Sequence, residues 1–355
     1  MVMNNDFKKF STKLLEGLPL RNKEVILRRF GLTESQKMET LEAIGKDYKI
    51  TRERVRQIEN DSLKRLKEKI KNSKIEPDFK ELEAYISSVL KQYGNVRKES
   101  KLLADLTAEK NKNFAYFILS LSPLFQRLDE GNSCYSVWTS SKETLALARS
   151  LCQSFEEKFQ SLGKTLTEQE VFDIYEKELK SQFKEPLTKE AFFSYLEICC
   201  HLAKTVDQKW GLVSWAEVSP KTIKDKIGMV LKSENKPLHF QDISQLIEQL
   251  NGKLEKVKKM SPHIQTVHNE LIKNNNFVLV GRGMYALKEW GYEPGQVKDI
   301  IVKVLKDASQ PLAKDEIIQA VAKQRAVKES TILSSLRNKN LFGKDESGKY
   351  QVREA

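Results

Sequence analysis

Along most of this chain, apolar residues recur every three or four positions, which is the pattern of amphipathic helices. The clearest stretch runs from Thr51 to Leu66, where Val55 and Ile58 fall on one side of a helix drawn at about 100° per residue. Thr51 stands where a helix N-cap is expected, because its hydroxyl can accept a hydrogen bond from a free backbone amide of the first turn. The pattern predicts a helix over these residues, with Val55, Ile58 and Leu66 turned toward a core.

A shorter amphipathic helix is predicted just before it, over residues Glu39 to Tyr48, with Leu41 and Ile44 facing inward. A short turn that contains Lys49 separates this helix from Thr51. Two short helices joined in this way make a helix-turn-helix, whose second helix enters the major groove of DNA.

The other face of the Thr51 helix is polar and chemically varied. Arg52, Glu53, Arg56 and Gln57 fall within one broad sector of that face. The forked donors of Arg and Gln match guanine and adenine edges in the major groove, and a Glu can accept from the cytosine amino group. The alternative interpretation is an ordinary solvated helix face of mixed charge.

Two segments resemble region 4 of bacterial sigma-70-type factors: LPLRNKEVILRRFGL, from Leu18 to Leu32, and TLEAIGKDYKITRERVRQIENDSLKRL, from Thr40 to Leu66. In that family the domain reads the −35 promoter element and also binds the flap of the RNA polymerase beta subunit. The resemblance implies double-stranded promoter DNA as one partner and bacterial RNA polymerase as a possible second. It also implies that Arg52, Glu53 and Gln57 touch bases.

By the same resemblance, Arg54, Arg56 and Thr40 would hold backbone phosphates or flank the bases, and Thr51 would open the helix that carries most of them. One position departs from the family pattern. Lys49 stands in the turn where the family usually places Gly, Asp or Asn, which suit a positive φ. This departure concerns the geometry of the turn rather than the polar face.

The resemblance covers about the first 75 of 355 residues. Family members carry this domain at their C-terminus, after the regions that melt the promoter and read the −10 element, and here no such regions precede it. We therefore expect a sigma-like DNA reader rather than a factor that opens promoters alone.

The charge of the chain agrees with a nucleic-acid partner. The net charge is +12, and residues 1–75 hold 19 Lys and Arg against 11 Asp and Glu, so that most of the excess lies beside the predicted recognition helix. Such a basic segment supplies the salt-dependent, sequence-independent part of DNA binding. The sequence has no signal-peptide pattern and no apolar run of membrane-spanning length, which predicts a cytoplasmic protein with no membrane partner.

Beyond the break at Glu76-Pro77 the chain repeats at a spacing of roughly 60 to 80 residues. Two or three helical stretches are followed each time by a strand-turn-strand signal with Gly, Asn or Asp at the turn. Three helices and a terminal hairpin are the winged-helix arrangement. The predicted fold class is mainly α, with a helix-turn-helix domain at 1–75 followed by tandem winged-helix modules at 76–141, 142–218, 219–292 and 293–355.

An aromatic residue marks each predicted hairpin. These aromatics are expected to be strand residues that pack back onto the helices, rather than DNA contacts. They are Trp138, Trp215, Trp290 and Tyr350.

The third module resembles the HARE-HTH domain, on the strength of PLHF (237–240) and the wing GRGMYAL (281–287). That family includes the N-terminal domain of the RNA polymerase delta subunit, and the resemblance implies contact with DNA or polymerase but no catalytic reaction. Ser261-Pro262 is predicted to open the third helix of the module, with His263, Gln265 and Thr266 facing outward. Arg282, at the tip of the wing between two glycines, is a candidate for a groove or phosphate contact, or else a solvated turn.

Other chemistry receives little support. The cysteines Cys134, Cys152, Cys199 and Cys200 have no C-x-x-C spacing, so reduced thiols are expected. Adjacent Cys200-His201 without a second pair is typical of a helix interior, and we expect no metal. Gly281-x-Gly283 lacks the third glycine of a nucleotide loop, so no cofactor is expected.

A nuclease pattern can be traced from Pro77-Asp78 to Glu99-Ser100-Lys101. Its two carboxylates fall on separate predicted helices rather than on one rigid scaffold, and we expect no enzyme and no small-molecule substrate. The sequence thus favours a DNA-binding transcription regulator that reads a −35-type element. The alternative is a delta-like accessory subunit of RNA polymerase whose DNA specificity is incidental.

Overall fold

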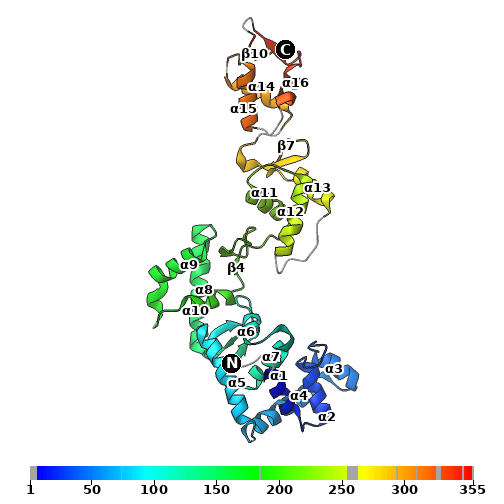
Figure 1. Ribbon diagram of the computed structural model, residues 1–355, viewed down its shortest axis with the longest axis vertical. Coiled ribbons are helices and arrows are strands. Elements are labelled where there is room, and N and C mark those ends of the chain that lie inside the picture. The colour runs from blue at the N-terminus through cyan, green and yellow to red at the C-terminus, as the bar shows by residue number, and fades with distance from the viewer. Residues whose placement is uncertain are drawn as a thin grey trace. The chain divides into compact units, whose positions relative to one another are not determined.

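The computed structural model describes residues 6–72, 74–183, 185–253, 263–292, 295–308, 310–324, 329–345 and 348–353. The chain divides into two compact units, Met1–Val213 and Ser214–Ala355 (Figure 1). The fold is mainly helical with small antiparallel sheets, as the sequence predicts. Among the described residues, no helix is both long enough and apolar enough to cross a membrane.

The first unit opens with four helices. They are α1 (Asp6–Leu15), α2 (Leu20–Arg29), α3 (Leu41–Tyr48) and α4 (Arg52–Lys71). The predicted helix-turn-helix is confirmed in α3 and α4, although α4 continues well past the predicted end at Leu66. Val55, Ile58 and Leu66 are buried as predicted, and so is Ile44 on α3.

The rest of the first unit contains two runs of similar order. The first is α5 (Glu76–Gln92), β1 (Val96–Lys98), α6 (Glu99–Leu106), η1 (Glu109–Asn111), α7 (Lys112–Leu121), β2 (Gln126–Leu128) and β3 (Val137–Thr139). The second is α8 (Lys142–Leu162), α9 (Glu168–Ile174), η2 (Tyr175–Leu179), η3 (Lys180–Gln182), α10 (Lys189–Ile198), β4 (Leu202–Lys204) and β5 (Trp210–Leu212).

The second unit repeats the order twice more. It contains α11 (Ile223–Glu234), β6 (Leu238–His239), α12 (Phe240–Lys253), α13 (Ile264–Lys273), β7 (Phe277–Gly281), β8 (Met284–Leu287) and η4 (Lys288–Trp290). These are followed by α14 (Val297–Ala308), α15 (Lys314–Gln324), α16 (Glu329–Leu336), β9 (Phe342–Lys344) and β10 (Tyr350–Val352).

One pairing recurs in every run. A residue or short strand that follows the first helix pairs antiparallel with the last strand of the hairpin. The pairs are Val96 with Thr139, Leu166 with Trp210, Leu238 with Tyr285 and Leu312 with Tyr350. The order helix, strand or bridge, helix, helix, strand, strand agrees with winged-helix modules.

Two of the four aromatics predicted to be strand residues are not strand residues in the structure. Trp138 and Tyr350 are strand residues as predicted, but Trp215 lies beyond β5 and Trp290 belongs to η4. Trp210 and Tyr285 take the strand positions instead. Both are buried, because the pairing after the first helix fixes which residue of the last strand turns inward.

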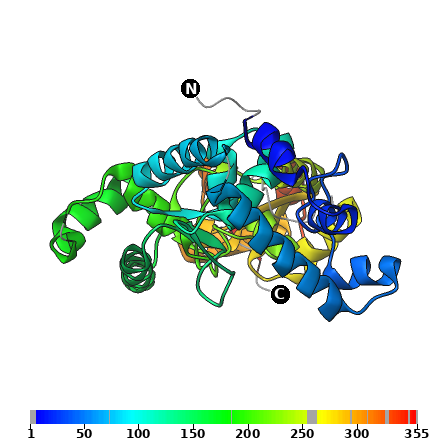
Figure 2. The same ribbon diagram turned by 90° about the horizontal axis from the view of Figure 1, so that it is seen from below.

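Helices α1, α2 and α4 share one hydrophobic core with the run that follows them. Helix α1 lies against α5 and α7 (Figures 1 and 2). Phe30 packs on Phe117 with ring centroids 5.0 Å apart, and Phe10 packs on Phe79 at 5.6 Å. The Asn113 amide also donates to two backbone carbonyls of the loop after α2. The two segments are therefore joined by packing, not only by the chain.

We predict that Phe117→Ala weakens the helix-turn-helix as well as its own module. Phe117 is completely buried, and truncating such a side chain costs about 3–5 kcal/mol. Native-state hydrogen exchange of the full chain should show faster exchange of the α4 amides. Phe155→Ala is the matched control, since Phe155 is equally buried but packs on Phe159 and Phe192. Unchanged α4 protection in Phe117→Ala would contradict a shared core.

Candidate DNA-binding site

Threonine hydroxyls cap both helices of the helix-turn-helix. The Thr40 Oγ1 accepts from the Ala43 amide at 3.1 Å, and the Thr51 Oγ1 accepts from the Arg54 amide at 3.2 Å. The N-cap predicted at Thr51 is confirmed. Each hydroxyl keeps its own proton, so it can still donate a hydrogen bond to a phosphate oxygen while it caps the helix.

The turn between the helices is tight and needs a positive φ. Lys49 adopts the left-handed conformation, with φ 54° and ψ 41°, and the Ile50 amide donates to the Gly45 carbonyl at 2.9 Å. A Cβ on Gly45 would lie 2.8 Å from the Ile50 carbonyl oxygen, closer than such contacts allow. Lys49 therefore occupies a conformation that Gly or Asn adopts more easily.

The polar face of α4 is presented to solvent. Arg52, Glu53, Arg54, Arg56 and Gln57 are all exposed, as the sequence predicts. On the reverse side of the helix, a small core of its own is formed by Val25, Ile44, Val55 and Ile58. The buried side therefore fixes the orientation of the helix, and its polar side chains point to solvent.

Side chains on this face already pair with one another. Arg56 donates to both carboxylate oxygens of Glu53, at 2.9 and 2.6 Å, and Arg54 donates to the Gln57 amide oxygen at 3.0 Å. The hydrogen bond from Arg56 lowers the pKa of Glu53, and the same bond raises the pKa of Arg56. Arg52 makes no hydrogen bond within the described part of the chain, so its guanidinium is available to a ligand.

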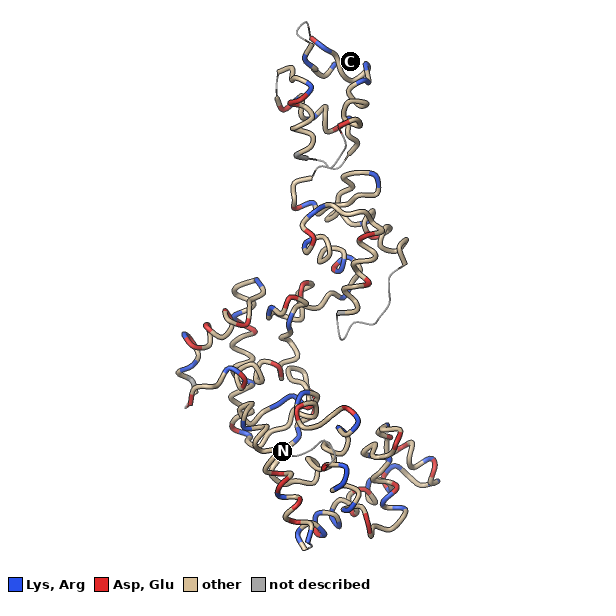
Figure 3. Tube along the Cα trace, viewed as in Figure 1, with Lys and Arg blue, Asp and Glu red and all other residues tan. Residues whose placement is uncertain are grey.

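Further along α4 the same face becomes basic. Lys64, Lys67 and Lys71 are exposed on it, and Asn60 lies between them and the Arg and Gln side chains. Figure 3 shows the Lys and Arg positions along the trace. The face thus changes from varied hydrogen-bonding groups at the N-terminal end of the helix to mainly positive charge toward its C-terminal end, where Glu68 lies among the lysines.

Helices α2 and α3 are joined by an ion-pair network around Arg28. Its guanidinium donates to both Glu39 oxygens, at 3.0 and 2.6 Å, and it also pairs with Asp47. The hydrogen bond from Arg28 lowers the pKa of Glu39. Arg29 pairs with Glu59 on α4 at 3.4 Å, so neighbouring arginines of α2 hold both helices of the pair.

Residues 14–68 match the family model of Sigma-70, region 4. The matched segment contains α2, α3 and most of α4. Among curated proteins, this chain is 46% identical over 66 residues to RNA polymerase sigma factor RpoD of Helicobacter pylori, and the aligned part is 19% of this chain and 10% of that protein.

The chain matches two further sigma factors at similar levels. RNA polymerase sigma factor RpoS of Coxiella burnetii is 45% identical over 67 residues, covering 19% of each chain. RNA polymerase sigma factor SigA of Nostoc is 39% identical over 72 residues, 20% of this chain and 18% of the relative. The chain thus spans between a tenth and a fifth of the length of these relatives.

Arg282, the remaining predicted contact, lies outside the region 4 segment and in the second unit. It is exposed in the turn between β7 and β8, as predicted for the wing tip. Gly283 beside it has a φ of 70°, and a Cβ there would lie 2.5 Å from His239 Nε2. The structure therefore brings together the predicted residues at α3 and α4, whereas Arg282 belongs to the second unit.

The start of α13 differs from the prediction. His263 is the N-cap, and its Nδ1 accepts from the Gln265 amide at 3.3 Å. Ser261 and Pro262, predicted to open this helix, lie outside the described residues. His263, Gln265 and Thr266 are exposed, as predicted.

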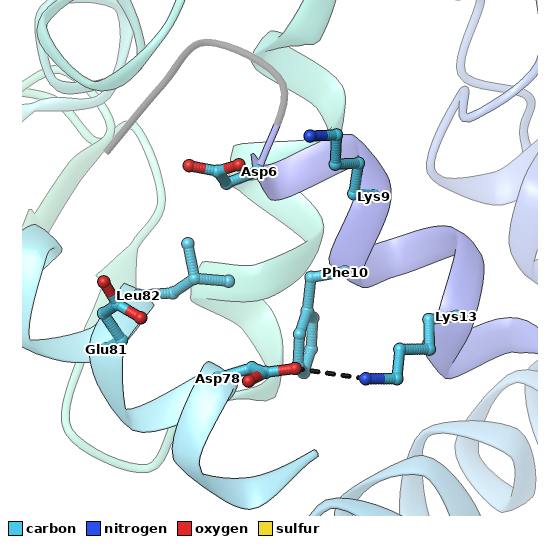
Figure 4. Close-up of a pocket in the computed structure, with 7 residues that line it drawn as sticks. All are labelled: Asp6, Lys9, Phe10, Lys13, Asp78, Glu81 and Leu82. Carbon is cyan, nitrogen blue, oxygen red and sulfur yellow. Dashed lines mark hydrogen bonds and ion pairs between the residues drawn. The ribbon is translucent and has the colours of Figure 1, made fainter. Parts of the chain in front are cut away.

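The carboxylates of the nuclease pattern have separate partners. Asp78 pairs with Lys13 at 3.2 Å at the edge of an open cleft between α1 and α5 (Figure 4). Glu99, the first residue of α6, accepts from the Arg127 guanidinium and from the Trp138 indole. The two acids therefore support the fold in different places.

Sequence reasoning missed a second cluster of chemically capable residues. Cys200 and His201 were predicted to lie inside a helix, which is wrong, because α10 ends at Ile198 and Cys199 is its C-cap. The corner after α10 brings Cys199 and His201 to Glu156 on α8. Glu156 lies 43 residues before Cys199. That separation hides the cluster from any search for local ligand spacing.

We predict that Lys49→Gly stabilises the region 4 segment by about 1 kcal/mol, because it removes the cost of a left-handed side-chain residue. Lys46→Gly is the matched control: Lys46 is also exposed but lies within α3, where glycine costs roughly 0.5–1 kcal/mol. Chemical denaturation of the full chain should show shifts of opposite sign. A loss of stability in Lys49→Gly would contradict the observed turn.

We also predict an acid-sensitive contribution from Glu39. Its pKa is depressed in the folded state, so its stabilising effect is complete above the ordinary Glu pKa of about 4.3 and is lost as the pH falls through the lower folded-state value. The thermal midpoint of Glu39→Gln should therefore lie below that of the wild type at neutral pH and converge with it in acid. A constant difference across the titration would rule out this role for Glu39.

Proposed function

We propose that the chain is a sequence-specific DNA-binding transcription regulator, in which α4 enters the major groove of a −35-type promoter element. The observation that carries the proposal is the exposed Arg, Glu and Gln face at the capped N-terminal end of α4. The similarity of residues 14–68 to Sigma-70, region 4 supports it, as do relatives that are named RNA polymerase sigma factors.

In this proposal three side chains read bases. Arg52 has a guanidinium with no hydrogen bond in the described part of the chain, and its two parallel donors fit the O6 and N7 atoms of guanine. Gln57 fits adenine and Glu53 accepts from the cytosine amino group. Both now bond a neighbouring arginine, so binding would exchange those exposed contacts for contacts to DNA.

Backbone contacts would come from the rest of the same face. Arg54 and Arg56 would turn to phosphates once their partners engage bases, and Thr40 can donate its hydroxyl proton. Lys64, Lys67 and Lys71 extend the positive charge along α4. These contacts would add affinity that falls with salt and does not depend on base sequence.

The modules after residue 75 would add contacts to flanking DNA or to polymerase, with Arg282 as one such contact. We propose a binding role for them and no catalysis. The HARE-HTH resemblance of residues 219–292 remains part of this proposal. It agrees with a module that contacts nucleic acid or the transcription machinery.

A second candidate is an RNA polymerase accessory subunit. Its support is Leu20, which is 86% exposed at the first position of α2, inside the segment similar to sigma factors. A partner protein that covered this side chain would bury apolar surface, which favours association. In this alternative the region 4 segment would contact the polymerase flap and DNA specificity would be incidental.

We predict that Arg52→Ala weakens binding to the selected DNA by roughly 1 to 3 kcal/mol and relaxes base preference at one position. The measurement is selection of bound sequences from random duplexes by the full chain, followed by affinity for selected and scrambled DNA at fixed salt. Lys64→Ala should weaken binding to both DNAs about equally. Arg65→Ala controls for lost charge, because Arg65 is exposed on a different side of α4.

Two results would reject the reading role. One is an equal loss for Arg52→Ala on selected and scrambled DNA. The other is no enriched sequence from the wild type. If Leu20→Ala then abolished co-purification with core RNA polymerase and left DNA affinity unchanged, the accessory-subunit candidate would replace the first.

A further inference from the structure

Helix α8 and the corner between α10 and β4 bring three metal-binding side chains together. They are Glu156, Cys199 and His201, and one ligand atom from each lies within 4.8 Å of the others. A thiolate, an imidazole and a carboxylate form a mixed donor set that suits Zn²⁺ and similar transition-metal ions. Mg²⁺ and Ca²⁺ prefer oxygen ligands throughout, so this set disfavours them.

One carboxylate links the other two groups. The Cys199 thiol donates to Glu156 Oε1 at 3.0 Å, and His201 Nδ1 lies 3.0 Å from Glu156 Oε2. Cys199 is completely buried, whereas about half of the His201 side chain is exposed. The cluster is therefore anchored in the core on its thiol side and open to solvent on its imidazole side, where an ion could enter.

The backbone around the cluster is held on both sides. Cys199 forms an isolated antiparallel bridge with Cys134, and the Tyr135 amide donates to the Ile198 carbonyl at 2.9 Å. The Val213 amide donates to the His201 carbonyl at 2.8 Å. Ligands on a corner fixed in this way lose little freedom when an ion binds, which favours binding.

All four cysteines of the sequence gather at this corner. Cys134 pairs with Cys199 through a backbone bridge, the Cys152 thiol donates to the Tyr195 carbonyl at 3.1 Å, and Cys200 is adjacent to Cys199 in the chain. Cys200 points elsewhere, since its thiol donates to the Asn132 carbonyl at 3.2 Å. Cys134 belongs to the first run and the three ligands belong to the second, so the corner lies where the two runs of the first unit meet.

We propose that Glu156, Cys199 and His201 bind one divalent transition-metal ion of the zinc class, with solvent in the remaining position. On binding, Cys199 releases its thiol proton to water and coordinates as a thiolate. His201 coordinates through Nδ1, so water takes the proton that Nδ1 donates to Glu156, and Nε2 holds the one proton of the neutral ring. Glu156 exchanges its two present hydrogen bonds for coordination, and the ion joins α8 to the corner after α10.

The test uses the full chain, stripped with a chelator and titrated with Co²⁺ and then with Zn²⁺. Wild type should bind one Co²⁺ per chain with the near-ultraviolet charge-transfer absorption of a cobalt thiolate, and Zn²⁺ should displace it. His201→Ala should weaken binding by at least about 100-fold. Because His201 is half exposed, this variant should fold, and circular dichroism would verify that. Cys199→Ser should abolish the thiolate absorption.

Two matched variants serve as controls. Cys200→Ser removes the neighbouring thiol, and His263→Ala removes an exposed imidazole in the second unit; both should bind Co²⁺ as the wild type does. The proposal is overturned if the folded wild type binds no Co²⁺, or if Glu156→Gln and His201→Ala bind it as tightly as the wild type. It is equally overturned if Cys200→Ser abolishes the thiolate absorption while Cys199→Ser keeps it.

Discussion

The burial of one stripe of α4 along its whole length is the constraint on which the N-terminal part of the chain depends. Near its start the helix packs through Val55 and Ile58, and toward its end through Leu66 and Ile70. A helix of 20 residues held at both ends cannot roll, because any rotation would expose apolar surface to water. Its polar face must therefore point outward. The position of that face is thus a result of core packing, not of the polar residues themselves.

The two buried parts of α4 belong to different cores. The first is the small core of the helix-turn-helix, and the second is the larger core shared with α5, α6 and α7. Lys69 strengthens the second attachment, since its ammonium group donates to the Leu14 carbonyl at the end of α1. Cations at this end of a helix satisfy carbonyls that have no partner within the helix. Helix α4 is therefore also part of the core of the neighbouring module.

Local features of the sequence were sufficient to predict the helix-turn-helix and the cap at Thr51, but not the cap at Thr40. Thr51 and the apolar spacing of α4 act over a few residues, so their pattern is visible in the chain itself. The positive φ at Lys49 was implied by the resemblance to sigma region 4, where this position is usually Gly, Asp or Asn. The repeating order of helices and hairpins could also be predicted, because its turn residues recur at a regular spacing.

Long-range packing could not be predicted in this way. Phe30 contacts Phe117, and Glu156 contacts Cys199, although the residues of each pair are far apart in the chain. The sequence around each residue does not indicate which distant residue it contacts. The prediction of which aromatics are strand residues was partly wrong for the same reason. Trp215 and Trp290 carry a strong hydrophobic signal, but antiparallel pairing with a distant residue selected Trp210 and Tyr285 for the strands.

The shared core has a geometric consequence for any complex with DNA. Because α4 and the module at 76–141 are packed together, the module would have a fixed angular position around the DNA axis whenever α4 lies in a groove. A second DNA contact made by that module would then depend on the number of base pairs that separate the two contacted segments. Inserting about 5 base pairs between the two contacted segments would turn one of them to the opposite side of the duplex, whereas inserting about 10 would restore the alignment. A flexible tether would show no such periodicity.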